Sequence, residues 1–253
     1  MNAIIIAAGS GKRISNDVKN IPKSMVKVNG RPIIEYQLSV LNKAGINEVY
    51  VITGPHSEKF NIKNIKYVKD EEYEKHDILG SLMKAKKFFE KDTLILYSDI
   101  IFELKIIKKI MNSKENISIA VDMNWEKNYE GRTEHLKSEA ENVELKNNSD
   151  IIRIKKNIEN VNNNVGEFLG IIKFTNKGSE LFIKKYEELV NSNNDVFHES
   201  PSILKAYVTD MIQELIDSNI KIKPILVSGK WCEIDTMQDL KNAEKIFSFN
   251  HIL

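Results

Sequence analysis

The first 122 residues alternate short apolar runs with longer amphipathic segments. The apolar runs are rich in isoleucine, valine and leucine, which is typical of strands that are buried on both faces. The segments between them place apolar residues at helical spacing. This alternation predicts the α/β class, with a mostly parallel central sheet flanked by helices. The expected strands are residues 3–8, 48–54, 93–99 and 117–123, and the expected helices are residues 31–45, 80–90 and 103–113.

After about Trp125 the pattern changes and strand signals become more frequent. Thr236 and Asp239 have the spacing of a capping box, which predicts that the last helix begins there. We expect a single domain, residues 1–253, in which a smaller β-rich lobe of about residues 123–175 follows a first part of about residues 1–122. The other expected elements are a hairpin over residues 141–156 that turns at 147–150, a strand at 166–174, helices within 178–191 and 201–218, and a strand at 222–229.

Composition argues against several classes of protein. Lys+Arg of 37 against Asp+Glu of 36 leaves a net charge of +1, whereas a general nucleic-acid surface needs a basic excess. No segment approaches the roughly 18 apolar residues of a membrane span, and no basic stretch precedes the first apolar run as it would in a secretory signal. Cys232 is the only cysteine, so one chain offers neither a disulfide nor a cysteine-based zinc site. We therefore expect a cytoplasmic protein without a nucleic-acid or membrane partner.

The stretch MNAIIIAAGSGKRI joins the first expected strand to a loop with two glycines and two cations. Such a loop can hold anionic oxygens on its backbone N–H groups. A Walker loop would need glycine at Ile6 and Ser or Thr at Arg13, and a dinucleotide fingerprint would need glycine at Ile14. The loop therefore predicts a phosphate site of neither type, in which the forked guanidinium of Arg13 can grip two phosphate oxygens.

Two carboxylates are expected at the carboxyl ends of strands. Asp99 closes the run TLILYSD, and Asp235 closes the short run WCEID. Ligands of open α/β sheets gather at this edge, and Mg²⁺ prefers oxygen ligands and the company of phosphates. Either carboxylate could equally be a helix cap or a surface charge. Lys23 follows Pro22, which fixes the backbone just ahead of it, although most of the chain's many lysines must be solvated.

Taken together, these motifs resemble the nucleotidyltransferase superfamily. The superfamily motif consists of Gly9-x-Gly11-x-Arg13 after the first strand, Pro22-Lys23, Asp99 and Asp235. Further stretches are similar to the cytidylyltransferases of phosphonate and phosphocholine pathways: GSLMKA, LYSDIIF, VDMNWEKNYEGRTEHLKSEAENVEL, GEFLGIIKF, YVTDMIQELI and GKWCEIDTMQDL. The opening loop alone indicates the superfamily, whereas GRTEH…SEAE and WCEIDT together indicate this narrower branch.

The resemblance implies a Rossmann-like nucleotidyltransferase domain whose first part, about residues 1–122, binds CTP. The implied nucleotide-binding residues are Ala8, Gly9, Ser10 and Gly11 near the phosphates and Ser81 near the base and ribose. Arg13 and Lys23 would neutralise the phosphates and the departing pyrophosphate, and Asp99 and Asp235 would hold Mg²⁺ as cofactor. A phosphoryl oxygen of the acceptor would then attack in line. Because the second pKa of a phosphomonoester is ~6, this oxygen is already anionic and needs no general base.

The resemblance also implies an acceptor site in the β-rich lobe and around WCEID. Trp231, Glu233 and Asp235 alternate, so they point to one face if this run is a strand. In the phosphocholine enzymes this neighbourhood encloses the quaternary ammonium, and a Trp face beside a carboxylate would suit any cation. Trp231 could equally be a core residue. Glu167 and Asp210 are further acidic candidates, and either could instead be a charge at the end of a strand or helix.

Arg132 lies in YEGRTEH, which resembles the phosphonate branch more than the choline branch. A bidentate arginine would bind a carboxylate or the phosphoryl group of the acceptor. His135, three residues further on, could assist or be structural.

The implied reaction is transfer of CMP from CTP to a small phosphorylated acceptor, in the context of capsular polysaccharide and phosphoramidate synthesis. The acceptors to consider are L-glutamine phosphate, which would give CDP-L-glutamine, then 2-aminoethylphosphonate, then phosphocholine. A sugar-1-phosphate nucleotidylyltransferase is a sibling alternative. An inactive nucleotide-binding regulator is an alternative of a different class, although both carboxylates and both loop cations are present.

Overall fold

A computed structural model of the protein describes residues 1–9, 14, 18, 20–147, 149–160, 162–192 and 196–248. Within these residues, nine strands form one mixed sheet in the order β10-β9-β11-β6-β1-β4-β5, and β8 pairs with both β11 and β12. The strands of this sheet are β1 (Asn2–Ala7), β4 (Val49–Thr53), β5 (Lys66–Lys69), β6 (Thr93–Tyr97), β8 (Ile117–Asp122), β9 (Glu141–Lys146), β10 (Asp150–Lys156), β11 (Val165–Phe174) and β12 (Lys223–Leu226).

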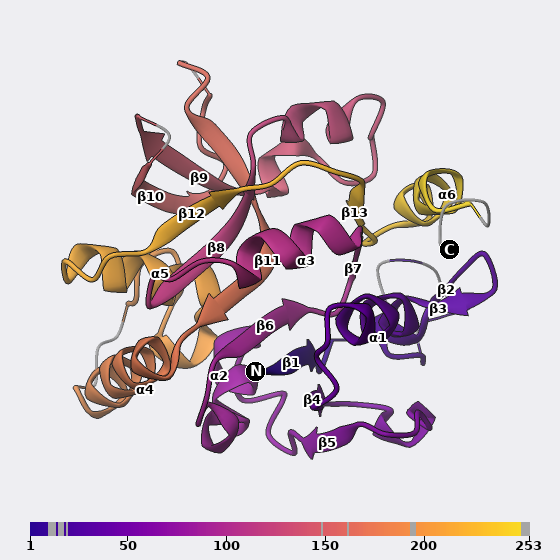
Figure 1. The fold of residues 1–253 in the computed structure, drawn as a ribbon, viewed down its shortest axis with the longest axis horizontal. Coiled ribbons are helices and arrows are strands. Elements are labelled where there is room, and N and C mark those ends of the chain that lie inside the picture. Colours follow the sequence, from indigo (N-terminus) through magenta and orange to yellow (C-terminus); the bar gives the residue numbers. More distant parts are fainter. Residues whose placement is uncertain are drawn as a thin grey trace.

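The two parts of the sheet run differently. β1 pairs parallel with β4 and β6, and β4 pairs parallel with β5. β11 is antiparallel to β6, β8 and β9, and β9 with β10 forms the hairpin predicted over residues 141–156. Figure 1 shows the parallel strands in its lower half and this hairpin at its upper left. The predicted α/β class is confirmed, with the parallel pairing concentrated in the N-terminal part of the chain.

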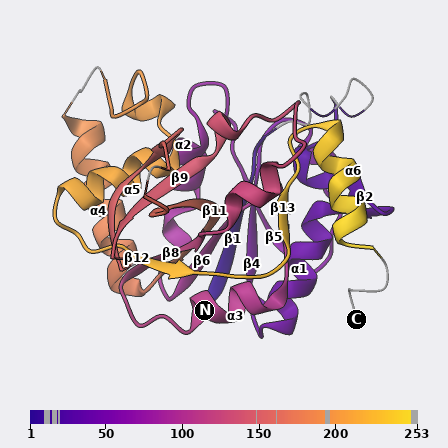
Figure 2. The same cartoon turned by 90° about the horizontal axis from the view of Figure 1, so that it is seen from above.

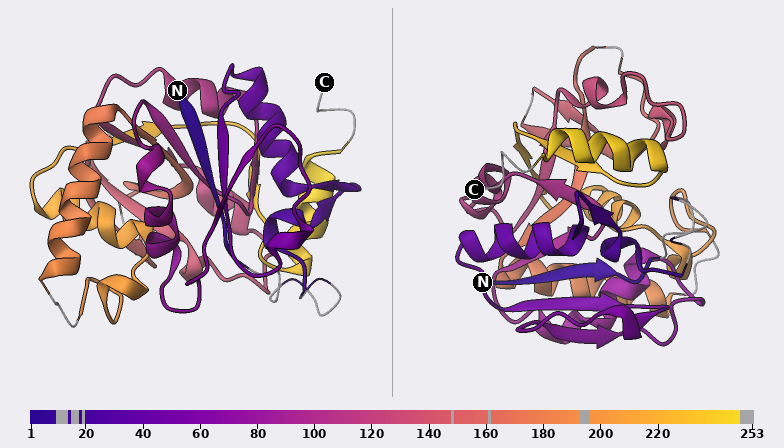
Figure 3. Two further views of the ribbon diagram at one scale, coloured as in Figure 1. Left: turned by 90° about the horizontal axis from the view of Figure 1, so that it is seen from below. Right: turned by 90° about the vertical axis from the view of Figure 1, so that its right-hand side faces the viewer.

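Helices cover both faces of the sheet. They are α1 (Ile33–Lys43), α2 (Ile78–Lys84), α3 (Leu104–Met111), α4 (Asn176–Asn191), α5 (Val208–Asp217) and α6 (Met237–Ile246). Leu82 of α2, Phe182 of α4 and Met211 of α5 belong to one apolar cluster. Ile34 of α1 and Ile107 of α3 belong to a second cluster on the opposite face of β1. Figures 2 and 3 show the strands between α4 and α5 on one side and α1 and α6 on the other. Burying each large aliphatic side chain contributes about 1.5–3 kcal/mol.

The ends of the helices agree with the sequence in part. Thr236 caps α6 as predicted: its hydroxyl oxygen accepts from the N–H of Asp239 at 3.2 Å, and the Asp239 carboxylate accepts from the N–H of Thr236 at 3.0 Å. The helix predicted over residues 80–90 is shorter, because α2 ends at Lys84 and a 3₁₀ turn follows. The helix predicted within residues 201–218 begins only at Val208.

Two small sheets were not predicted, because each depends on pairing between short segments. β2 (Lys27–Val28) pairs with β3 (Arg31–Pro32), and β7 (Ile100–Phe102) pairs with β13 (Trp231–Glu233). Each strand is too short to show a periodicity of its own. The β7–β13 pair joins segments that lie about 130 residues apart in the chain.

A glycine shapes the middle of β11. The pairing of β11 with β8 shifts register between Phe168 and Ile172. Gly170 lies within this irregular stretch with φ of 65°, a left-handed conformation that glycine adopts without a steric penalty. A Cβ atom added there would approach Cγ of Tyr97 to 2.6 Å. The absent side chain therefore allows β11 to bend while the Tyr97 ring packs against it.

We expect Gly170→Ala to lower the free energy of unfolding by about 2–4 kcal/mol, because it combines left-handed backbone strain with a clash. Gly45→Ala is the matched control: φ is 85° there, but apart from Gly45 and its two chain neighbours no atom of the described residues lies within 4 Å of the added Cβ. The control should cost only the strain, about 1–2 kcal/mol. Urea unfolding of both variants measures the difference, and equal losses would show that the contact with Tyr97 is unimportant.

Candidate active site

The β7–β13 pair brings Asp99 and Asp235 together. Glu233 lies opposite Ile100 in the register of this antiparallel pair. Asp99 directly precedes β7 and Asp235 follows β13, so the pairing places both at the same end. The N–H of Ile234 also donates to the backbone oxygen of Asp99 at 2.9 Å. The two candidate metal ligands therefore converge, as their positions at strand ends suggested.

Lys23 lies between these two carboxylates. Its ammonium donates to Oδ2 of Asp99 at 2.7 Å and forms an ion pair with Oδ1 of Asp235. The backbone N–H of Lys23 donates to the oxygen of Gly9 at 3.3 Å, which ties this turn to the end of β1. Lys23 is only 8% exposed. A buried cation in this position offsets the repulsion between two poorly solvated carboxylates.

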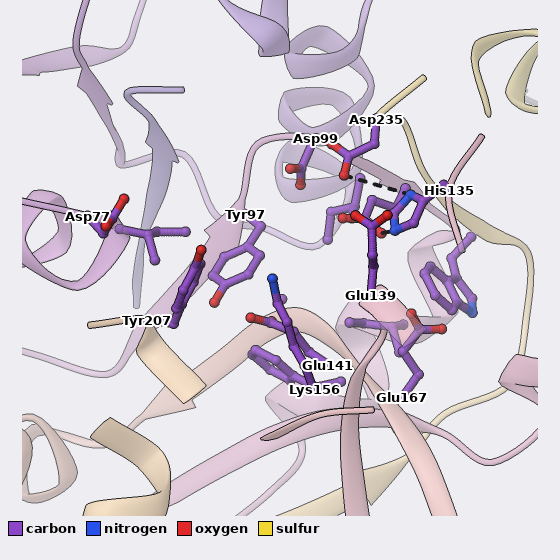
Figure 4. Close-up of a pocket in the computed structure, with 17 residues that line it drawn as sticks. Asp77, Tyr97, Asp99, His135, Glu139, Glu141, Lys156, Glu167, Tyr207 and Asp235 are labelled. Carbon is purple, nitrogen blue, oxygen red and sulfur yellow. Dashed lines mark ion pairs between the residues drawn. The ribbon is translucent and has the colours of Figure 1, made fainter. Parts of the chain in front are cut away.

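A cavity of about 190 Å³ opens beside this cluster. Within the described residues, its wall contains seven carboxylates: Asp77, Asp99, Glu139, Glu141, Glu167, Glu233 and Asp235. It also contains four aromatic rings and two basic side chains: Tyr97, Phe168, Tyr207, Trp231, His135 and Lys156. Figure 4 shows Asp99, Asp235 and His135 on one side of the cavity and Asp77 and Tyr207 on the other. An acidic, partly aromatic cavity favours a ligand that carries a positive group.

Glu167 has an unused hydrogen-bond acceptor in this wall. The residue is 3% exposed, and its Oε1 accepts from the hydroxyl of Tyr129 at 2.5 Å. Its Oε2 has no hydrogen-bond partner in the part of the chain that the structure describes. Burial raises the pKa of Glu167 well above its ordinary value. A positive N–H donor on a ligand would favour the ionised form of this carboxyl group and would supply the missing hydrogen bond to Oε2.

Trp231 and Glu233 both line the cavity together with Asp235, which agrees with the predicted alternation along this strand. The indole N–H of Trp231 donates to Oδ2 of Asp122 at 2.8 Å and fixes the ring. Desolvation and the nearby charge of Asp99 raise the pKa of Glu233. This carboxyl group is therefore held where a positive group on a ligand would favour its ionised form.

Arg132 does not line this cavity. Its guanidinium forms an ion pair with Oδ1 of Asp239 at 2.9 Å and lies 4.4 Å from the centre of the Tyr129 ring. Its side chain is 6% exposed. Nη2 of Arg132 is directed at groups of the protein, which favours a role through its neighbours, whereas Nε has no hydrogen-bond partner among the described residues. Direct binding of the acceptor by Arg132 stays a prediction.

Asp210 also has protein partners in place of a position in this cavity. Its Oδ2 accepts from the N–H of Tyr207 at 2.8 Å and from the hydroxyl of Ser200 at 2.7 Å. It thereby completes a capping box at the start of α5. The alternative of a helix charge, which the sequence left open, describes this residue better than contact with the acceptor.

Ala8, Gly9 and Ser81, the described members of the predicted nucleotide-binding set, are not among the residues that line the cavity. Ala8 and Gly9 follow β1, and Ser81 is buried in α2, where its hydroxyl donates to Oδ2 of Asp70 at 2.7 Å. Ser10, Gly11 and Arg13 lie outside the described residues, so their predicted roles stay predictions.

His135 is the member of this wall whose role the sequence left open. It is 3% exposed, with Nε2 at 3.8 Å from Oε2 of Glu233 and Nδ1 at 3.7 Å from Oδ2 of Asp235. Within the described residues, His135, Glu233 and Asp235 offer ligand atoms that all lie within 4.8 Å of one another. In the sequence, only the position of His135 within GRTEH pointed to a role in the site. A single histidine is more often structural, so that signal was weak.

A family model for the MobA-like NTP transferase domain matches residues 3–137 of the chain. The chain belongs to this family. Among the described residues of this nucleotidyltransferase, no helix has the length and apolar character needed to cross a membrane.

Two curated relatives and one solved structure show which nucleotidyltransferases this chain is similar to. It is 31% identical over 254 residues to the CTP:phosphoglutamine cytidylyltransferase of Campylobacter jejuni, covering 95% of this chain and 98% of that relative. It is 35% identical over 133 residues to a bifunctional sugar-1-phosphate nucleotidylyltransferase/acetyltransferase of Sulfurisphaera tokodaii, covering 51% of this chain and about a third (32%) of that protein. The fold matches a CTP:phosphocholine cytidylyltransferase from Streptococcus pneumoniae with a TM-score of 0.72 and 20% identity, over 97% of this chain and 98% of the other.

Glu141 should make the stability of the protein depend on pH. Desolvation raises its pKa to about 8, and the charges of Glu233 and Asp99 act in the same direction. Between about pH 4.5 and pH 8 the folded state therefore holds a proton that the unfolded state has released, so stability falls as pH rises. We expect Glu141→Gln to remove a slope of at most about 1.4 kcal/mol per pH unit in this window.

Urea unfolding at several pH values between 5 and 8 measures this slope. The same substitution at Glu144, which lies on the same strand and pairs with Arg153 on the surface, reports the effect of replacing a carboxylate outside this cavity. A Glu141→Gln protein with the wild-type slope would contradict the prediction.

Proposed function

We propose that this nucleotidyltransferase transfers CMP from CTP to a phosphoryl oxygen of a small phosphorylated amino acid and releases pyrophosphate. The observation that carries the proposal is the convergence of Lys23, Asp99 and Asp235 at the edge of a strongly acidic cavity. Such a site can receive a triphosphate on one side and a cationic acceptor on the other. The full-length similarity to a CTP:phosphoglutamine cytidylyltransferase supports both the nucleotide and the class of acceptor.

The proposed reaction forms a bond between the acceptor's phosphoryl oxygen and the α-phosphorus of CTP, and it breaks the bond from that phosphorus to the bridging oxygen of the departing pyrophosphate. The attacking oxygen is anionic at neutral pH, since the second pKa of a phosphomonoester is ~6. The protein's task is therefore to orient the two substrates and to neutralise charge, and no side chain has to remove a proton. We assign that task to Lys23 and, from the sequence, to Arg13.

The carboxylates fit a divalent cation. Oδ1 of Asp99 is buried without a hydrogen-bond partner among the described residues, so one oxygen ligand remains available. Asp99 and Asp235 would hold Mg²⁺, a hard cation that binds carboxylate and phosphate oxygens. When bound, Mg²⁺ would neutralise phosphate charge and polarise the α-phosphorus. Lys23 contacts both carboxylates, so a cation held by them would compete with its ammonium for the same oxygens.

The acceptor is proposed to carry an N–H donor on its positive group. The free Oε2 of Glu167 and the buried hydroxyl oxygen of Tyr97, which has no hydrogen-bond partner among the described residues, call for hydrogen bonds. A primary ammonium supplies such bonds, whereas a quaternary ammonium does not. L-Glutamine phosphate is therefore our first choice, followed by 2-aminoethylphosphonate and then phosphocholine. A hexose 1-phosphate would leave the acidic wall without a counter-charge.

Pyrophosphate release tests the proposal. We expect release when the protein is mixed with CTP, Mg²⁺ and L-glutamine phosphate, and much less with phosphocholine or glucose 1-phosphate. Asp235→Asn should lower kcat by about 100-fold or more, since charge neutralisation at the phosphates is lost. Asp217→Asn, on α5, is the matched control and should keep the wild-type rate. Pyrophosphate release with glucose 1-phosphate alone would favour the sugar-1-phosphate alternative, and silence with every acceptor would favour the regulator.

Lys23→Gln should expose the cation site in the absence of nucleotide. Removing one partner of a buried ion pair leaves uncompensated carboxylates and costs about 3–5 kcal/mol. We expect Mg²⁺ to raise the Tm of this variant without CTP and to have little effect on the wild-type Tm.

Lys173→Gln is the matched control, because Lys173 is also buried but pairs with Asp92 and Ser113. It should lose stability without recovery by Mg²⁺. Equal responses of all three proteins to Mg²⁺ would argue against Asp99 and Asp235 as cation ligands.

A further inference from the structure

A hydrogen bond between Arg132 and His135 determines which imidazole nitrogen carries the proton. Nη2 of Arg132 lies 2.7 Å from Nδ1 of His135. A guanidinium has only N–H donors and no acceptor, so Nδ1 must be the acceptor in this bond. The hydrogen of a neutral imidazole then resides on Nε2, which faces Oε2 of Glu233 at 3.8 Å in the cavity wall.

We infer that Arg132 is a positioning residue that holds His135 as a fixed Nε2–H donor to an anionic oxygen of the acceptor. The identity of that ligand rests on the proposed function, whereas the hydrogen-bond direction does not. The acidic wall supplies many hydrogen-bond acceptors but few hydrogen-bond donors. The neutral N–H donor of His135, beside Glu233, therefore gives the anionic end of the acceptor substrate a place to bind. Arg132 thus contributes to the site through His135 and without contact with the substrate.

The same bond argues against two other roles for His135. A metal ion bound at Nε2 would leave the ring hydrogen on Nδ1, where it would oppose the N–H of Arg132. The close grouping of His135, Glu233 and Asp235 is therefore not a metal centre while Arg132 is in place. A general base would need a free lone pair on the nitrogen that faces the cavity. Nε2 faces the cavity but is protonated in this tautomer, so His135 cannot act as a general base through it.

Arg132 itself is held firmly. Its guanidinium pairs with Oδ1 of Asp239 at 2.9 Å, and Asp239 also caps α6. The neighbouring Gln238 accepts from the N–H of Thr133 at 2.8 Å and donates to the oxygen of Gly131 at 2.9 Å. The segment that carries His135 is therefore docked on the start of α6, directly after Asp235.

Loss of Arg132 should reverse the tautomer. Oδ2 of Asp239 lies 3.5 Å from Nδ1 of His135, and Oδ2 of Asp235 lies 3.7 Å from it. Without the guanidinium, a hydrogen on Nδ1 can donate to either carboxylate. Nε2 would then present a lone pair to the cavity and would repel an anionic oxygen.

The tautomer can be observed by ¹H–¹⁵N correlation through the imidazole ring in ligand-free protein labelled with ¹⁵N-histidine. The chain has five histidines, and His135→Gln assigns the signal. We expect the Nε2–H pattern in the wild type, the Nδ1–H pattern or a mixture in Arg132→Met, and the wild-type pattern in Arg153→Met. Arg153 is the matched control because it pairs with Glu144 on the surface. An Nδ1–H pattern in the wild type would overturn the inference, and so would an unchanged pattern in Arg132→Met.

Kinetics with CTP and L-glutamine phosphate give a second, independent test. Gln places an N–H donor near the position of Nε2, so His135→Gln should keep kcat/KM for the acceptor within about threefold, whereas His135→Ala should lose about 10- to 100-fold. Arg132→Met should show a similar loss, with the KM for CTP unchanged and the KM for the acceptor raised. Arg132→Lys retains one donor and should recover part of the loss. Equal losses of kcat/KM for the acceptor in His135→Gln and His135→Ala would overturn the role of His135 as a hydrogen-bond donor. If no variant or wild-type protein turns over, the proposed function fails, while the NMR result still decides the tautomer.

Discussion

The contact of the Lys23 ammonium with two buried carboxylates is the interaction on which the site depends. Asp99 and Asp235 come from segments about 130 residues apart, and the short β7–β13 pair forces them together. Two carboxylates that contact the same ammonium group would repel each other strongly without it, because little water reaches them. Their close approach therefore needs a cation. Lys23 supplies it from a third segment, which Pro22 and the hydrogen bond to Gly9 hold at the end of β1. Fold and site therefore stabilise each other.

Much of this could be predicted from the sequence, because the strongest signals are local or follow from parallel-sheet topology. Apolar runs gave the buried strands, and the Thr236–Asp239 spacing gave the start of α6. The carboxyl ends of strands gave a common edge for Asp99 and Asp235. Even the alternation of Trp231, Glu233 and Asp235 described the cavity wall correctly, since side chains on a strand repeat every second residue.

The residues whose roles could not be predicted bond to partners that the sequence alone does not identify. Arg132 has the chemistry of an anion-binding residue, but its Nη2 contacts Asp239 on α6 and the nearby His135, and the sequence does not show that it bonds to them. Asp210 has the spacing of a cap only once the true start of α5 at Val208 is known. β7 was missed because three residues cannot show a period, although this strand positions Asp99. Polar side chains can be recognised from sequence, but their choice of partner requires the fold.

The two sequence stretches that indicated the narrower branch were GRTEH…SEAE and WCEIDT, and in the structure GRTEH docks on the helix start that directly follows WCEIDT. Arg132 pairs with Asp239, and Gln238 bonds to the backbone on both sides of Arg132. One stretch carries His135 and the other carries Glu233 and Asp235, so a donor and two carboxylates reach the cavity as one unit. A shift of either stretch would move His135 and the carboxylate beside Lys23 together. In the proposed reaction, recognition of the acceptor and neutralisation of the triphosphate would therefore be linked through the start of α6.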